Sequence, residues 1–280
     1  MLRVFVDSGS SIKQDEAAKY NVTLIPLNIL LGDKEYKDGV DLSMEEFYSF
    51  LIDKKEFPKT SLPNLEEIRT AVTAFTDQGD DVIILTISSK ISSTHDSIKR
   101  MFENNSHVLV LDSMMAVGGM RLIVDEINRN RDKSLKEIEK IVNDLIPRIQ
   151  IMAIPETLEY LFRGGRLAKM EFLIGSLLKI KPIIGFKDGK VTVHAKKMGL
   201  KNSMNFIAKS LETLECDPAH EIIASYTYNK KNLDDLVAMC DKKFLPQIKV
   251  YDDLDPAIAC HWGPNAFGLI FVGKKVEETK

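Results

Sequence analysis

The chain has 280 residues, of which 44% are hydrophobic, so it can bury a sizeable core in one large or two ordinary domains. Its formal net charge of -3 gives no support for a nucleic-acid-binding or membrane-surface role. The cysteines number three and show no C-x-x-C spacing, which argues against a disulfide framework or a zinc site.

The N-terminal residues read as a short alternating strand, without the apolar length or the cleavage site of a signal peptide. The longest apolar stretch, 172–184, is interrupted by Lys179, Lys181 and Pro182 and is shorter than the ~20 residues that span a bilayer. We therefore expect a cytoplasmic protein without stable membrane insertion.

The first half of the chain alternates strand-like and helical segments. Strands are predicted near 4–6, 22–27, 82–85 and 108–111, and helices near 43–52, 64–77, 93–103, 114–129 and 134–147. This alternation predicts a parallel sheet covered by helices. Asn64 with Glu67, and Ser134 with Glu137, have the spacing of capping boxes at helix starts.

Polar residues follow three of these predicted strands, at Asp7-Ser8, Ser88 to Thr94 and Asp112-Ser113. They should gather at the carboxyl edge, where open α/β sheets bind ligands. The middle loop offers five hydroxyls before a helix, and helix-start amides favour a carboxylate or phosphate. Ordinary N-capping is the alternative, but it uses only one hydroxyl. A second hydroxyl cluster, Thr60 to Pro63, is expected in a loop that leads into a helix.

The second half has an α+β pattern. A hairpin with an Asp188-Gly189 turn is followed by helices near 200–214 and 231–243 and strands near 221–226 and 247–251. We place the boundary near residue 150, which gives an N-terminal parallel-sheet α/β domain, 1–150, and a C-terminal α+β domain, 151–280.

His261 stands in a run rich in glycine and proline, 255–268, before an apolar strand that begins at Leu269. Glycine and proline fix backbone angles, so we interpret His261 as a residue on a shaped loop, aimed at a cavity. A solvated or structural histidine is the alternative.

A helix is predicted over 167–178, with apolar residues at helical spacing: Leu167, Met170, Ile174, Leu177 and Leu178. This face must be buried, either in an ordinary core or as the lining of a ligand tunnel. The eleven methionines favour a tunnel slightly, because flexible thioethers tolerate variable apolar ligands.

Six short motifs in a fixed order carry a resemblance that covers essentially the whole chain. They are Asp7-Ser8, Thr60-Ser61-Leu62-Pro63, Ser88 to Ser97, Leu111 to Ser113 with Gly118-Gly119, Leu158 to Leu161 with Arg163-Gly164-Gly165-Arg166, and His261-Trp262-Gly263-Pro264. In this order and spacing the chain resembles the DegV family of bacterial fatty acid-binding proteins. It departs from the family pattern at five positions: Asn64, Lys90, Ser93, Trp262 and Asn265.

The resemblance implies a long-chain fatty acid in a tunnel between the two domains, lined by the apolar face of 167–178. It assigns the carboxylate to the hydroxyls of Thr60 and Ser92, the backbone amide of Ser93 and the nearby His261, with Ser61 as an outer candidate. The fatty acid is then a bound ligand, and neither a metal nor another cofactor is expected.

Family members present the bound carboxylate to a separate ATP-dependent fatty acid kinase, which makes the acyl phosphate used in phospholipid synthesis. The resemblance thus implies a carrier without catalysis of its own. Arg163 and Arg166, around two glycines, read as an exposed basic loop suited to docking that kinase.

Two other classes stay open. A serine hydrolase would use Ser92 as nucleophile and His261 as base, although G-x-S-x-G is absent; ester turnover lost in Ser92→Ala would identify it. A phosphate- or nucleotide-binding enzyme would have to work without either glycine-rich phosphate-binding motif.

Overall fold

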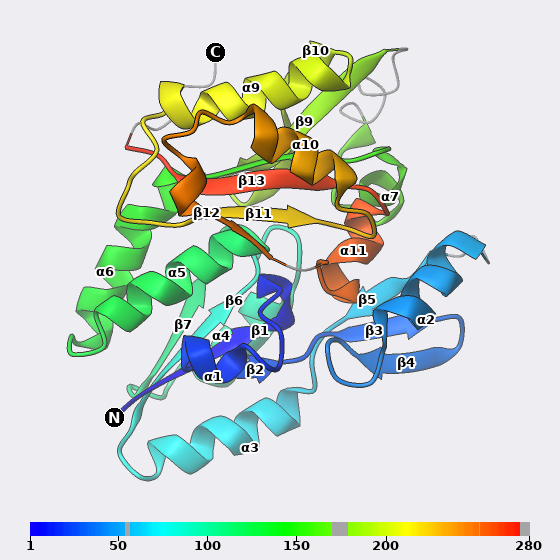
Figure 1. The fold of residues 1–280 in the computed structure, drawn as a ribbon. Helices are drawn as coiled ribbons and strands as arrows, with labels where there is room; N and C mark the ends of the chain where they lie inside the picture. Colours follow the sequence, from blue (N-terminus) through cyan, green and yellow to red (C-terminus); the bar gives the residue numbers. More distant parts are fainter. Residues whose placement is uncertain (54–56, 170–178, 252, 275–280) are drawn as a thin grey trace. The chain divides into compact units, whose positions relative to one another are not determined.

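The computed structural model describes residues 1–53, 57–169, 179–251 and 253–274 (Figure 1). The chain forms two compact units. Unit 1 comprises Met1–Asp144 and Asp255–Ile258, and unit 2 comprises Leu145–Leu254 and the chain from Ala259 onward.

The core of unit 1 is a parallel sheet with strand order β2-β1-β6-β7, as the alternating pattern predicted. Its strands are β1 (Leu2–Asp7), β2 (Thr23–Ile25), β6 (Asp81–Thr86) and β7 (Val108–Asp112). Because β1 and β6 are neighbours and run the same way, the polar residues after both strands lie at one edge of the sheet.

The predicted helices of unit 1 are confirmed. The elements are α1 (Ala17–Tyr20), α2 (Met44–Tyr48), α3 (Leu65–Thr76), α4 (Thr94–Met101), α5 (Gly118–Arg129), α6 (Leu135–Leu145), the short 3₁₀ helices η1 (Ser8–Ser10) and η3 (Ile146–Arg148), and the π-helix η2 (Ser49–Asp53). Helices α3 and α4 cover one face of the sheet, where Val72 and Ile98 pack with Phe5. Both capping predictions hold: Asn64 accepts from the first amides of α3, and Ser134 and Glu137 bond each other reciprocally.

A three-stranded antiparallel sheet in unit 1 was not predicted. It has the order β4-β3-β5, with β3 (Asn28–Leu31), β4 (Lys34–Lys37) and β5 (Lys59–Ser61). Thr60 therefore lies on a strand opposite Ile29, and the expectation of a loop at this position was wrong. Strands of three or four residues are too short to show a convincing alternation of polar and apolar side chains.

Unit 2 is built on a six-stranded mixed sheet of order β10-β9-β8-β13-β11-β12, parallel only between β11 and β12. Its strands are β8 (Ile149–Ile154), β9 (Ile180–Lys187), β10 (Lys190–Met198), β11 (Ile222–Tyr226), β12 (Ile248–Val250) and β13 (Phe267–Val272). The hairpin between β9 and β10 has the predicted tight turn, because Asp188 and Gly189 both have positive φ.

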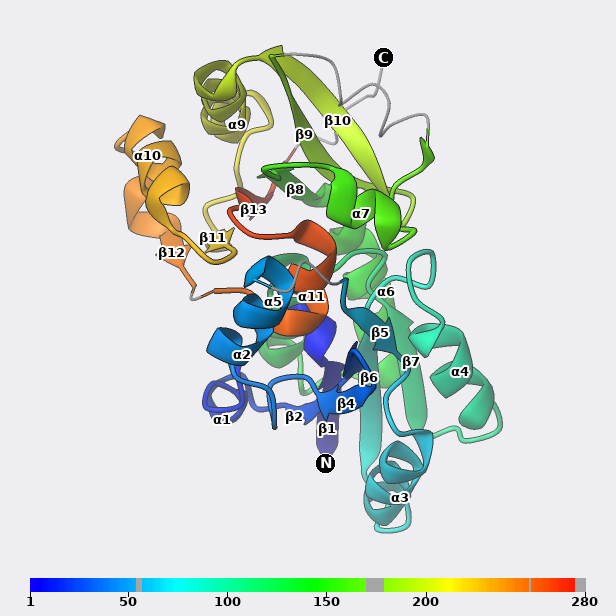
Figure 2. The ribbon, with the colours of Figure 1, turned by 90° about the vertical axis from the view of Figure 1, so that its right-hand side faces the viewer.

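Two helices, α9 (Leu200–Thr213) and α10 (Lys231–Met239), lie next to each other on one face of this sheet (Figure 2). Their buried residues, such as Ile207 and Leu236, pack onto Leu269 and its neighbours. The remaining elements of unit 2 are α7 (Glu159–Arg163) and the short turn η4 (Leu245–Gln247).

Helix α11 (Pro256–Trp262) corrects the prediction for His261, which lies in its last turn and not on a loop. Proline is well placed at the first position of a helix, and Gly263, with φ +71°, follows the last helical residue. The glycine and proline of this run therefore mark the two ends of a short helix. Its start, Asp255–Ile258, belongs to unit 1 and its end to unit 2.

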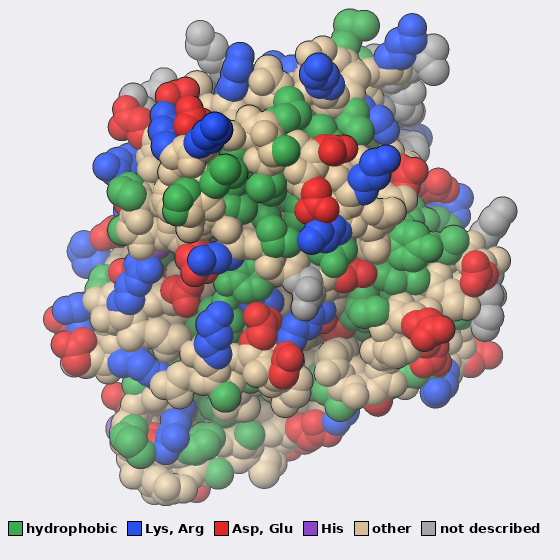
Figure 3. Space-filling model, viewed as in Figure 1, with side chains coloured by type: hydrophobic (Ala, Val, Ile, Leu, Met, Phe, Trp, Pro, Cys, Tyr) green, Lys and Arg blue, Asp and Glu red, His purple; other side chains and the backbone are tan. Residues whose placement is uncertain are grey.

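Among the described residues, no helix is long and apolar enough to cross a membrane. The surface in Figure 3 mixes charged and apolar side chains, and lysine and arginine stand out along its upper edge, over α9 and β10. The sequence accounts for these basic side chains, because residues 179–213 hold eight lysines and only two acidic residues.

Candidate functional site

Asp7 ties the ends of two strands together at the carboxyl edge of the parallel sheet. Its carboxylate accepts from the backbone amides of Gly9 at 2.9 Å and Ile87 at 2.7 Å, and the residue is fully buried. Burial raises the pKa of Asp7 to about 7, against the opposing effect of the two amide bonds. Asp7 thus fixes the backbone just after β1 and β6 at this edge of the sheet.

The loop after β6 is fixed at both ends. Ser88 is buried and its amide donates to the carbonyl of Met115, while the amide of Ser89 donates to the carboxylate of Asp112 at 3.2 Å. Two of the five hydroxyl residues, Ser88 and Thr94, are completely buried, so we interpret them as part of the loop's own structure.

Ser92 and Ser93 stand at the beginning of α4. The Ser92 hydroxyl lies 2.9 Å from that of Thr94 and also accepts from the Thr94 amide at 3.3 Å. Ser92 is half-buried, whereas Ser93 is exposed and its side chain caps no amide. The helix start thus combines a partly accessible hydroxyl with amides at the positive end of the helix dipole.

Thr60 and Ser61 come from β5 of the small sheet. Thr60 is half-buried, and Ser61 is exposed and donates to Glu35 at 3.4 Å. The hydroxyl candidates Thr60, Ser61, Ser92 and Ser93 all belong to unit 1, while His261 belongs to unit 2.

The ring of His261 packs tightly against α7 and the loop that follows it. A Cβ added to Gly164 would lie 2.3 Å from the Nδ1 atom of His261, so only glycine fits here without movement. Nδ1 is buried, and burial together with the Arg166 guanidinium lowers the pKa of His261 to about 3. The imidazole is therefore neutral at physiological pH and carries one N–H donor.

The two arginines of the glycine loop differ, which corrects the expectation that both are exposed. Arg163 is exposed and pairs with Glu159 at 2.6 Å. Arg166 is half-buried, donates to the carbonyl of Gly164 at 2.6 Å and faces His261 closely enough to affect its pKa. The arginine spacing alone could not reveal this, because the fold of the loop decides where each side chain goes.

The expected apolar helix lies only partly within the described residues. Leu167 is buried, with 4% of its surface exposed. Met170, Ile174, Leu177 and Leu178 lie outside the described residues.

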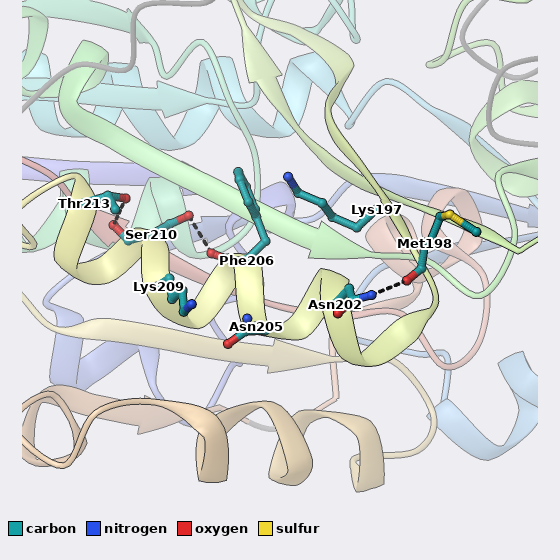
Figure 4. Close-up of a pocket in the computed structure, with 8 residues that line it drawn as sticks. All are labelled: Lys197, Met198, Asn202, Asn205, Phe206, Lys209, Ser210 and Thr213. Carbon is teal, nitrogen blue, oxygen red and sulfur yellow. Dashed lines mark hydrogen bonds between the residues drawn. The ribbon is translucent and has the colours of Figure 1, made fainter.

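A groove of about 420 Å³ lies on unit 2, along α9 and the end of β10 (Figure 4). Its lining includes Lys197 and Lys209, and the Lys197 ammonium sits 4.5 Å from the centre of the Phe206 ring. None of the predicted carboxylate ligands lines it. In the part of the chain that the structure describes, no group of acidic, histidine and cysteine residues could hold a metal ion.

Comparisons with known proteins give matches over nearly the whole chain. The model of a protein family described as uncharacterised, the DegV family, matches residues 1–274. A DegV domain-containing protein of Caldanaerobacter subterraneus is 30% identical, and the match covers 98% of this chain and 99% of the relative.

Two solved structures have the same fold. A DegV family protein from Thermus thermophilus, described by its fatty acid binding, is 26% identical with a TM-score of 0.86, covering 97% of this chain and 99% of the other. A fatty acid binding DegV family protein from Streptococcus agalactiae is 22% identical with a TM-score of 0.88, covering 98% and 99%.

Proposed function

Because the chain belongs to the DegV family, we propose that it binds one long-chain fatty acid. The observation that carries this proposal is the likeness over nearly the whole chain to a solved DegV protein described by its fatty acid binding. The neutral His261 and the hydroxyls at the start of α4 are suitable donors for a carboxylate.

We assign the carboxylate to the hydroxyls of Thr60 and Ser92, the amide of Ser93 and the His261 imidazole, with Ser61 as an outer partner. A neutral imidazole donates a hydrogen bond without placing a second charge in a poorly solvated region. Each such bond to an ionised headgroup contributes about 1.5–3 kcal/mol. The headgroup contacts orient the ligand and prevent the burial of an unpaired charge.

The apolar tail provides most of the affinity. A 16-carbon acid has about 14 methylenes, and burying them at ~0.8 kcal/mol each stabilises the complex by roughly 11 kcal/mol before ordering costs. We place this tail against the apolar face that begins at Leu167.

Competition binding tests both parts of the assignment. Hexadecanoic acid should displace a fluorescent fatty acid at least tenfold better than its methyl ester, which has the same tail and no charge. Ser92→Ala should reduce this preference, whereas Ser93→Ala should preserve it, because the proposal uses only the backbone amide of Ser93. Equal binding of acid and ester by the unmodified protein would exclude a carboxylate site.

We further propose that the protein is a cytoplasmic carrier that presents the carboxylate to a separate ATP-dependent fatty acid kinase for acyl phosphate formation. Arg163 is exposed and suits an acidic partner surface. Arg166 lies beside His261 and suits the headgroup or the phosphate transferred to it.

An exposed ion pair elsewhere provides a matched control. Arg163 pairs with Glu159, and Lys140 pairs with Asp144 with the same helical spacing at 2.8 Å. Arg163→Glu should slow acyl phosphate formation with the purified kinase and ATP while fatty acid occupancy stays unchanged, and Lys140→Glu should alter neither. Equal rates for both variants would remove Arg163 from the docking surface.

A further inference from the structure

A buried polar cluster in unit 1 surrounds the start of α11. Asp38, in the loop after β4, and Asp255, just before α11, are exposed by only 2% and 4%. The Lys13 ammonium lies 2.5 Å from Asp255, and the Ala257 amide donates to Asp38 Oδ1 at 3.1 Å. None of these side chains belongs to the fatty acid site assigned above.

Asp38 caps this helix from a distant part of the chain. The first amides of a helix have no partner within it, and the sequence Asp255-Pro256 is typical of a helix whose own aspartate caps them. In this fold the Asp255 carboxylate is paired with Lys13, and the amide of Ala257 donates to Asp38. The beginning of α11 is therefore held by a residue 219 positions earlier in the chain.

We propose that Asp38 is a positioning residue for His261: by capping the first turn of α11 it fixes the helix that carries His261 in its last turn. A helix of seven residues has two turns, so a shift at Ala257 is passed on to His261, four residues later. The inference rests on the proposed function and extends it, because His261, which donates a hydrogen bond to the fatty acid carboxylate, then has a fixed position before a ligand binds.

The charges around Asp38 support a role as a neutral cap. It faces Asp255, Lys13 and the Ser8 hydroxyl, and Asp255 in turn faces Arg121 and Glu16. Burial and the Asp255 carboxylate raise the pKa of Asp38 to about 8. Asp38 therefore accepts the Ala257 amide as a neutral carboxylic acid at neutral pH.

Two substitutions separate capping from charge. Asp38→Asn keeps an oxygen acceptor for the Ala257 amide and mimics the protonated acid, whereas Asp38→Leu has similar bulk and no acceptor. In NMR titrations the His261 pKa should stay far below its ordinary value in Asp38→Asn. In Asp38→Leu it should rise towards the ordinary value of about 6.5, because the ring is no longer held in its buried place.

Fatty acid retention provides the second measurement. Asp38→Leu should release hexadecanoic acid about tenfold faster, as expected for one displaced hydrogen bond to a charged group. Asp38→Asn should stay within twofold of the unmodified protein. Asp80→Leu, which breaks the ion pair of Asp80 with Arg3 away from α11, controls for general destabilisation and should leave the His261 pKa unchanged.

These measurements distinguish a failure of the positioning role from a failure of the proposed function. If the unmodified protein binds no fatty acid but Asp38→Leu still shifts the His261 pKa, the positioning role stands and the function is wrong. If a folded Asp38→Leu retains both the His261 pKa and the release rate of Asp38→Asn, the positioning role is wrong. Should Asp38→Leu fail to fold, Asp38→Ser, which is too short to reach the amide, takes its place with the same expectations.

Discussion

Replacing Gly164 by alanine separates the position of His261 from the general stability of unit 2. Gly164 has an ordinary helical φ of -71°, so alanine causes no backbone strain. Its Cβ would lie 2.3 Å from His261 Nδ1, whereas ordinary contacts begin near 3.4 Å, so the ring must retreat by about 1 Å. Overpacking of this kind costs about 1–3 kcal/mol.

The displaced ring should also lose its bond to the fatty acid carboxylate. At about 1.5–3 kcal/mol per bond to a charged group, and 1.4 kcal/mol per factor of ten, the affinity for hexadecanoic acid should fall roughly 10- to 100-fold. Fluorescent displacement measures the affinity, and thermal unfolding measures the stability.

The neighbouring glycine is the matched control. Gly165 has φ +73° and no atom within 4 Å of an added Cβ, so Gly165→Ala strains the backbone without touching His261. The Gly165→Ala variant should lose about 1–2 kcal/mol of stability, similar to the loss in Gly164→Ala, and should retain its affinity for hexadecanoic acid. If Gly164→Ala binds fatty acid as well as Gly165→Ala does, His261 is not a carboxylate ligand.

Three further expectations concern His261, the hydroxyl ligands and Asp7. The free energy of unfolding should fall as the pH drops from about 6.5 towards 3, because His261 binds a proton in the unfolded chain but stays neutral in the folded protein. In urea unfolding measured over this pH range, His261→Gln should show a smaller fall. Ser92→Ala, and more mildly Thr60→Ala, should weaken hexadecanoic acid binding by about 1–3 kcal/mol while circular dichroism stays unchanged; full affinity in both would place the carboxylate elsewhere. Asp7→Asn should destabilise the protein by about 1–3 kcal/mol in urea at pH 8, because one of the two backbone amides that donate to the Asp7 carboxylate would face an NH₂ group. An unchanged urea midpoint would contradict that geometry.

Rising pH gives the opposite trend through Asp38. The folded protein keeps a proton there that the unfolded chain releases near pH 4, so stability should decrease between about pH 4 and 8. Asp38→Asn should make this slope shallower, and an identical slope would show that Asp38 does not hold that proton. Part of the slope should persist because the pKa of Asp7 is also raised.

The sequence predicted the parallel sheet of unit 1 because its strands are long apolar runs with helices between them. β6, for example, is buried along nearly its whole length. The start of α3 was equally clear, because Asn64 and Glu67 interact within four residues. Local signals of this kind need no tertiary structure to be recognised.

Features that depend on distant contacts could not be predicted. Helix α11 resembled a loop because glycine and proline dominate its flanks, and its cap comes from Asp38, far away in the sequence. Arg163 and Arg166 each flank the same pair of glycines in the sequence but have different surroundings in the fold. The overall charge of -3 likewise concealed the lysine-rich segment of β9, β10 and α9.

Mass spectrometry of the protein as purified from cells, first native and then denaturing, tests fatty acid binding most directly. The account predicts one acid of about 14–18 carbons for each chain, the length range for which methylene burial gives high affinity. Empty protein that also takes up none of these acids when they are added would contradict it.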